Sequence, residues 1–271
     1  MPLTTYDEYK AAITNPPAKN MGLITKQTQT AGTIGSTLAV APLALAVPTT
    51  AVAPTNLTYS AFQGTGFLDT TNKCYAGYVT FDSVSTSAAG GILIDRLSHQ
   101  GGLSGTVTTE QTTNLPTAAL TRNTSGVGVF IALQIYTQIG TTATTVTVRY
   151  TNTANASSTS QAVVFGGTSF REANRFISIP LADGDIGVKS VEGVTVLATT
   201  GTAGAFGVVL YRPLMFLPTF GGYNNFGSTP SEGVMLFGGR VIEIPQDGCL
   251  DLIVMGPAAA SNVCVHTIET T

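Results

Sequence analysis

The chain has 271 residues, a length that fits one large all-β domain or two small ones. Only 10% of the residues are Asp, Glu, Lys or Arg, whereas an average soluble domain has about 25%, so the composition favours a subunit whose surface faces other protein. The net charge is −3 with 12 basic residues, which argues against nucleic acid as a partner because phosphate binding needs clustered Lys and Arg.

The first predicted element is a short N-terminal helix. Thr4 and Thr5 can cap a helix over Tyr6–Ile13, and Asn15-Pro16-Pro17 would end it. From residue 18 to about 56 the chain is rich in Gly, Thr, Pro and Ala and has no periodic apolar face. We therefore expect residues 1–56 to form an extended arm, with its helix at about 5–13, that is ordered only against another surface.

We expect neither a targeting segment nor a membrane-spanning segment in this region. Met1–Lys10 carries acidic residues and lacks the apolar run of a secretory signal peptide. Leu38–Ala53 is apolar, but Pro42 and Pro48 interrupt it and it is shorter than a bilayer span. We expect synthesis and assembly in the cytoplasm and no membrane partner.

After Leu57 the pattern changes to short β-branched and aromatic runs separated by turn residues. In the run Val127–Ile139, alternation places five apolar residues on one strand face: Val127, Val129, Ile131, Leu133 and Ile135. Thr144–Thr151 repeats the alternation, and Ala162–Phe165 is its predicted hairpin partner after the polar link Asn152–Ser160.

Further strands follow toward the C-terminus. They are predicted over Arg175–Leu181, Ile186–Leu197, Gly207–Arg212 and Val263–Ile268, with a turn at Ala182–Asp185. Val241–Ile244 and Cys249–Met255 flank the turn Pro245–Gly248 and predict a β-hairpin.

These elements predict an all-β fold. There is no fixed repeat and no strand–helix alternation, so residues 57–271 are expected to form an antiparallel β-sandwich or jelly roll that follows the arm 1–56. Two stacked small sandwiches, divided near Thr151–Ser160, are the alternative.

Candidate metal and redox residues are few. His99 and His266 each lack a second His at metal-ligand spacing, which favours ordinary core or surface positions. Asp69 and Asp183-Gly184-Asp185 carry oxygens that calcium would accept, but a plain polar turn is the better interpretation of the second group. The three cysteines, Cys74, Cys249 and Cys264, have no CxxC spacing and are expected to be buried apolar residues. Cys249 and Cys264 on neighbouring strands would alternatively be close enough to cross-link in an oxidising medium.

No catalytic constellation is predicted. The sequence has no GxSxG, and the turn Gly126-Val127-Gly128 is followed by a strand where phosphate binding requires a helix. The carboxylates that a glycosidase would pair are scattered, as Asp82, Asp95, Glu110 and Glu172. Arg171, Glu172 and Arg175 are expected to form surface or subunit-boundary ion pairs. We therefore predict no enzyme activity and no catalytic, cofactor-binding or metal residues.

Aromatic residues offer little for carbohydrate binding, because the chain has no Trp and only 8% aromatic residues. The group Phe216, Phe220, Tyr223 and Phe226 is expected to lie in an interface or core. The Gly-rich loop Gly221–Pro230 is the candidate ligand-binding tip if the protein is an adhesin.

Four segments carry a resemblance to a known group of proteins. The N-terminal TTYDEYKAAI and the body segments GILIDRLSHQGGLSG, NLPTAALTR and FGVVLYRPL resemble virion structural proteins of tailed bacteriophages, particularly capsid decoration or cement proteins. The resemblance implies a β-sandwich or jelly-roll body, often trimeric, on the outer capsid surface at threefold or quasi-threefold positions. It also implies an arm that reaches across neighbouring major capsid protein subunits, so that the partners are that protein and further copies of this chain.

Two other classes of function stay open beside the decoration protein. One is another virion component, such as a head fibre, a tail protein or a receptor-binding adhesin, and the other is an enzyme. A major capsid protein is disfavoured because the pattern is poor in helix.

Overall fold

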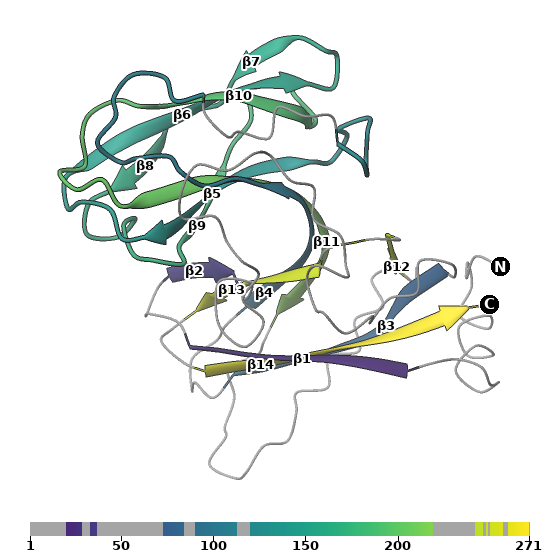
Figure 1. The fold of residues 1–271 in the computed structure, drawn as a ribbon. Coiled ribbons are helices and arrows are strands. Elements are labelled where there is room, and N and C mark those ends of the chain that lie inside the picture. The colour runs from purple at the N-terminus through teal and green to yellow at the C-terminus, as the bar shows by residue number, and fades with distance from the viewer. Residues whose placement is uncertain are drawn as a thin grey trace. The chain divides into compact units, whose positions relative to one another are not determined.

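The computed structural model of the chain describes residues 20–28, 33–36, 73–83, 90–112, 120–218, 242–245, 248, 250–256 and 260–270 (Figure 1). All regular elements in these ranges are β-strands, their pairing is antiparallel, and none of the described elements is a helix. The all-β, antiparallel prediction is therefore confirmed. The predicted helix at about 5–13 lies outside the described residues.

Contacts divide the chain into two compact units. The first comprises Met1–Thr33, Thr58–Asp95 and Leu214–Thr271, and the second comprises Ile34–Leu57 and Arg96–Pro213. Strands β4 (Gly90–His99) and β11 (Ala205–Pro218) each contribute residues to both units. The alternative of two separate sandwiches would place their boundary near residues 151–160. These residues lie within the second unit.

The first unit contains a sheet with the order β1-β14-β3-β12. Its strands are β1 (Asn20–Thr28), β14 (Ala260–Thr270), β3 (Lys73–Ser83) and β12 (Ile242–Ile244). Strand β1 lies within the predicted arm and pairs with β14 from Asn20↔Ile268 to Thr28↔Ala260. This part of the arm is thus a sheet strand of its own chain. A short strand, β2 (Thr33–Ser36), follows β1 in the sequence.

The predicted C-terminal hairpin is wrong. Strand β12 pairs with β3, whereas β13 (Leu250–Gly256) pairs with β4 from Leu250↔Asp95 to Met255↔Gly90. The segment between them carries a hydrogen bond of the kind found in turns, from the Gly248 amide to the Pro245 carbonyl at 2.9 Å. It leads the chain from one sheet into another, an outcome that strand and turn residues alone do not distinguish from a hairpin.

The second unit has two layers (Figure 1). In one layer β6 (Ala143–Asn152) pairs with β10 (Val188–Val196), β7 (Ser157–Thr159) and β8 (Val163–Gly166). In the other, β5 (Phe130–Thr137) lies between β11 and β9 (Phe176–Ile179). The predicted pairing of Thr144–Thr151 with Ala162–Phe165 is confirmed as β6 with β8. Strand β7 was not predicted because SST has no apolar residue.

A single hydrophobic core fills the space between these two layers. Alternate residues of the strands point into it, including Ile131, Leu133 and Ile135 of β5, Val146, Val148 and Tyr150 of β6, and Phe206, Val208 and Leu210 of β11. Burying each large apolar side chain contributes about 1.5–3 kcal/mol. Val129 belongs to this core, but Val127 is 51% exposed, which corrects its predicted place on the core face. It lies in a turn between Gly126 and Gly128, whose φ angles of 75° and 70° interrupt the alternation before β5 begins.

The side chain and backbone of Thr200 join several loops at one end of this unit. The buried Thr200 hydroxyl accepts a hydrogen bond from the Gly140 amide at 3.1 Å and donates to the Thr202 carbonyl at 2.9 Å. The Thr200 carbonyl accepts from the Thr142 amide at 3.0 Å, and the Thr200 amide donates to the Gly105 carbonyl at 2.9 Å. These bonds fix the loops that precede β6 and β11.

Candidate functional site

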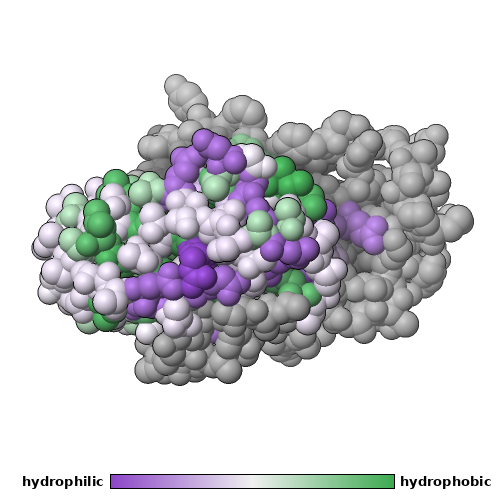
Figure 2. Space-filling view, turned by 90° about the horizontal axis from the view of Figure 1, so that it is seen from above, coloured by the Kyte–Doolittle hydropathy of each residue, from purple (hydrophilic) through white to green (hydrophobic). Residues whose placement is uncertain are grey.

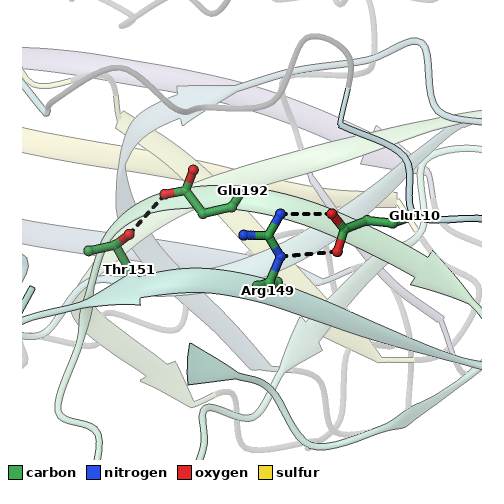
Figure 3. A network of polar contacts seen from close by, with 4 residues as sticks. All are labelled: Glu110, Arg149, Thr151 and Glu192. Carbon is green, nitrogen blue, oxygen red and sulfur yellow. Dashed lines mark hydrogen bonds and ion pairs between the residues drawn. The ribbon is translucent and has the colours of Figure 1, made fainter. Parts of the chain in front are cut away.

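The outer face of the β10-β6-β7 sheet carries a network of polar side chains (Figure 3). Arg149 points outward from β6, because its neighbours Val148 and Tyr150 point into the core. Its guanidinium donates to both carboxylate oxygens of Glu110, from Nε to Oε2 at 3.0 Å and from Nη2 to Oε1 at 2.7 Å. Beside this pair, Glu192 accepts from Thr151 at 2.9 Å and from Ser190 at 2.6 Å.

This network has a structural role that its geometry explains. Glu110 precedes Gln111, which forms an isolated β-bridge with Val194 of β10, so the ion pair holds the segment before Gln111 on the sheet. The hydrogen bond from Arg149 lowers the pKa of Glu110, which makes the carboxylate a weaker base. Because the two side chains are 40% and 38% exposed, the pair contributes at most about 1 kcal/mol.

A second polar group joins the turn before β10 to β6. The Tyr150 hydroxyl donates to Asp185 Oδ2 at 2.6 Å and accepts from the Ala182 amide at 2.8 Å. Asn152 Nδ2 donates to Asp185 Oδ1 at 2.8 Å. Burial, followed by the hydrogen bond to Asp185, raises the pKa of Tyr150 to about 12, and the same bond lowers the pKa of Asp185.

These contacts bear on the calcium hypothesis for Asp183-Gly184-Asp185. Both oxygens of Asp185 already accept hydrogen bonds, and Asp183 Oδ1 accepts from Gln161 Nε2 at 2.9 Å. Among the residues that the structure describes, no group of three or more His, Cys, Asp or Glu side chains is placed to hold a metal ion. The polar-turn interpretation agrees with this arrangement, in which Gly184 takes a φ of 89°.

A buried polar layer covers the face of β5 that points away from the core. Arg96 Nη1 donates to Gln134 Oε1 at 2.9 Å, and the Tyr136 hydroxyl donates to the Gln100 carbonyl at 3.0 Å. That carbonyl lies directly over Gly207, where any Cβ would collide with it. Arg96, Gln100 and Gln134 are at most 1% exposed. Sequence reasoning missed this layer. The signal that could have revealed it is Gln134 within the otherwise apolar run FIALQIY.

His99 belongs to the same region of the chain and is 3% exposed. Burial, and secondarily the positive charge of Arg96, lowers its pKa to about 3. The imidazole is therefore neutral at physiological pH. Its Nδ1 atom, like Gln100 Oε1 and Gln134 Nε2, has no hydrogen-bond partner among the residues that the structure describes.

The carboxylates that a glycosidase would pair lie on separate strands and connecting segments of the structure. Asp82 lies on β3 opposite Asn262, Asp95 is buried next to Arg96, and Glu110 is bound by Arg149. Glu172 lies 3.7 Å from Arg175, which forms the expected ion pair. Arg175 is not a surface residue, however, because it is 7% exposed and its guanidinium packs over the Phe170 ring at 4.8 Å.

The remaining candidate residues lie on sheet strands or outside the described ranges. Cys74 on β3 is opposite Glu269, and Cys264 on β14 is opposite Thr80, so these two cysteines are not cross-strand partners. His266 on β14 is opposite Gly22 and Tyr78. Phe216 is 47% exposed. Asp69, Cys249, Phe220 and the loop Gly221–Pro230 with its Tyr223 and Phe226 lie outside the described residues.

Comparisons with known proteins identify no relative, since no protein-family model, curated protein or solved structure matches the chain. Within the described ranges, the chain has no helix of the length and apolar character needed to cross a membrane.

Proposed function

We propose that this chain is a non-enzymatic structural protein of a tailed-phage virion. It binds the outer capsid surface and stabilises the shell by bridging neighbouring major capsid protein subunits, as a homotrimer. Its body would be a jelly roll, and residues 1–56 would form the arm, of which the part before β1, residues 1–19, would reach across the shell. Assembly would take place in the host cytoplasm. The proposal rests on the sequence resemblance and on the way in which the described charged groups are used.

The observation that carries the proposal is that many of the described charged side chains make contacts within their own unit. Arg149 binds Glu110, and Asp185 is held by Tyr150 and Asn152. Lys189 donates to Asn155 at 2.7 Å, and Arg212 donates to Asn123 at 3.0 Å. These charged groups are already paired within the unit, where they hold strands and turns together. The rest of the surface is therefore suited to contacts with other protein.

An arm explains how such a protein would attach to an assembled shell. A segment without its own core loses conformational entropy when it is ordered, so it binds only where the partner surface is complete. Three arms on one trimer multiply weak single contacts into tight attachment. Low charge also reduces the cost of desolvation when the interface is buried.

The test is a deletion of residues 1–19, which stops just before β1 begins at Asn20 and so keeps the strand that pairs with β14. We expect the truncated chain to keep the far-ultraviolet circular dichroism and thermal midpoint of the full chain and to lose binding to undecorated capsids in a sedimentation assay. A folded truncated chain that still decorates capsids with unchanged affinity would contradict the role of the arm.

The position on the particle separates this proposal from the fibre, tail or adhesin alternative. Immunogold electron microscopy with antibody against residues 57–271 should label the heads evenly. Labels confined to the tail tip or to a fibre would replace the decoration role by the adhesin role and make the loop Gly221–Pro230 the next target.

A further inference from the structure

One end of the second unit contains four described segments without Asp, Glu, Lys or Arg. We call it the uncharged end and define it as residues 104–108, 140–145, 164–168 and 197–203. Hydrogen bonds make these segments neighbours, from the Gly105 amide to the Ala203 carbonyl at 2.8 Å and from the Ala198 amide to Thr144 Oγ1 at 2.9 Å. The Thr200 contacts described above connect the same loops.

Three large apolar side chains are exposed on this end. Leu197 is 74% exposed, Val164 is 48% exposed and Val107 is 39% exposed. Leu197 and Val164 lie on either side of Thr145, since the Leu197 amide donates to the Thr145 carbonyl at 2.9 Å and Val164 is opposite Thr145 in the β6–β8 register. Both point outward, because the adjacent Val196 and Phe165 are buried in the core.

The hydropathy of the surface follows the same division. In Figure 2 the left end of the coloured surface, where Figure 1 shows the connection from β10 to β11, is mostly white and green, and purple residues form a band nearer the middle. In the described part of the chain, three charged residues border the uncharged end. They are the mutually bound Glu110 and Arg149, and Arg171, whose carbonyl accepts from the Ile139 amide at 3.1 Å.

The opposite end of the same unit provides a contrast. Val127 and Ile186 are 51% and 61% exposed there, and the Ile186 carbonyl accepts from the Gly128 amide at 3.0 Å. The two loops that carry them also contain Arg122, Asp183 and Asp185, and Lys189 follows at the start of β10. Exposed apolar residues are thus mixed with charges at that end, as on an ordinary surface.

We propose that the uncharged end is the surface through which copies of this chain associate with one another, with Leu197 and Val164 of one copy packed against the same end of the next. The inference rests on the homo-oligomer within the proposed function. A partner of ordinary composition would bury charged side chains against a surface that offers no opposite charge, which is unfavourable. Two uncharged ends meet without that penalty, and this chain, with 10% charged residues, is itself such a partner.

The distribution of apolar groups also suits a closed ring. In a trimer each copy makes two different contacts, because the interface joins unlike patches. The uncharged end offers two such patches. Leu197 and Val164 lie on the outer sheet face, whereas Val107 lies on the separate segment that leads to Gln111 at the edge of β10. One patch of each copy would meet the other patch of its neighbour.

The experiment compares the full chain with Leu197→Glu and Ile186→Glu by sedimentation velocity over a range of concentrations. Both positions are exposed and apolar, and they lie at opposite ends of the unit, so the second variant controls for added charge. We expect Leu197→Glu to raise the dissociation constant of the oligomer about tenfold or more, as for loss of a central contact. Ile186→Glu should leave it unchanged. Circular dichroism verifies folding, and Val164→Glu on β8 is the second test variant.

Each outcome has a distinct meaning. An oligomer that Leu197→Glu and Val164→Glu leave intact, or that Ile186→Glu alone dissociates, overturns the inference while the proposed function stands. A wild-type chain that is monomeric at every concentration overturns both the inference and the trimer, and capsid sedimentation then still tests attachment to the shell.

Discussion

Substitution of Gly140 is expected to destabilise the second unit, because backbone atoms lie very close to this residue. A Cβ added there would lie 2.6 Å from the Thr202 amide nitrogen and closer still to the carbonyl carbon and oxygen of Thr200. All three neighbours are backbone atoms, which move only if the loop moves. In Gly140→Ala the hydrogen bonds that Thr200 accepts from Gly140 and Thr142 would therefore be disrupted.

The expected loss follows from these contacts. Two hydrogen bonds contribute about 0.5–1.5 kcal/mol each, and overpacking a rigid site costs about 1–3 kcal/mol. We therefore expect Gly140→Ala to lower the free energy of unfolding by about 2–6 kcal/mol, measured by urea denaturation with circular dichroism. For comparison, the total stability of a domain is about 5–15 kcal/mol.

Gly184→Ala is the matched control. No atom lies within 4 Å of a Cβ at Gly184, but its φ of 89° is unfavourable for alanine, so the variant reports backbone strain alone, about 1–2 kcal/mol. If Gly140→Ala were destabilised no more than Gly184→Ala, the close approach of Thr200 to Gly140 would be refuted.

Two further predictions concern the polar groups. The pKa of Asp185 is lowered in the folded chain, chiefly by the Tyr150 hydrogen bond, so its stabilising effect is present above the ordinary carboxyl pKa and is lost as the pH falls through the lowered value. The difference in urea midpoint between the wild type and Asp185→Asn should thus shrink on acidification, and a difference independent of pH would contradict it. For Arg149 and Glu110, a double-mutant cycle with Gln should give a coupling energy below about 1 kcal/mol that falls further in 1 M salt. A larger coupling that salt leaves unchanged would mean that the pair is less solvated than its exposure indicates.

Strands of the second unit that carry apolar residues could be predicted where one face lies in the core and the other face has a different composition. In β6 the alternation of Thr with Val146, Val148 and Tyr150 reports burial directly. Strand β5 shows the limit of this reasoning. Both of its faces are buried, so Ala132 and Gln134 are as inaccessible as Ile131 and Leu133, and period-two alternation no longer separates the core from the polar layer.

The sequence predicts the pairing of β6 with the nearby β8, but it does not predict pairing between strands that are distant in the sequence. The strand residues around Pro245–Gly248 were placed within one or two positions, yet β12 and β13 pair with β3 and β4. A turn fixes the local change of direction, whereas pairing depends on strands distant in the sequence. The polar sites share this difficulty, since Glu110 and Arg149 are 39 residues apart and no spacing rule connects them.

The position of the charged residues strengthens the argument from composition. Arg96 and Arg175 are 1% and 7% exposed, so they add nothing to the surface charge that an approaching partner meets. Arg149 is neutralised locally by Glu110. Since like charge and hydration are what keep separate proteins apart, a unit with this distribution favours association, and the end without charge is where association meets the least resistance.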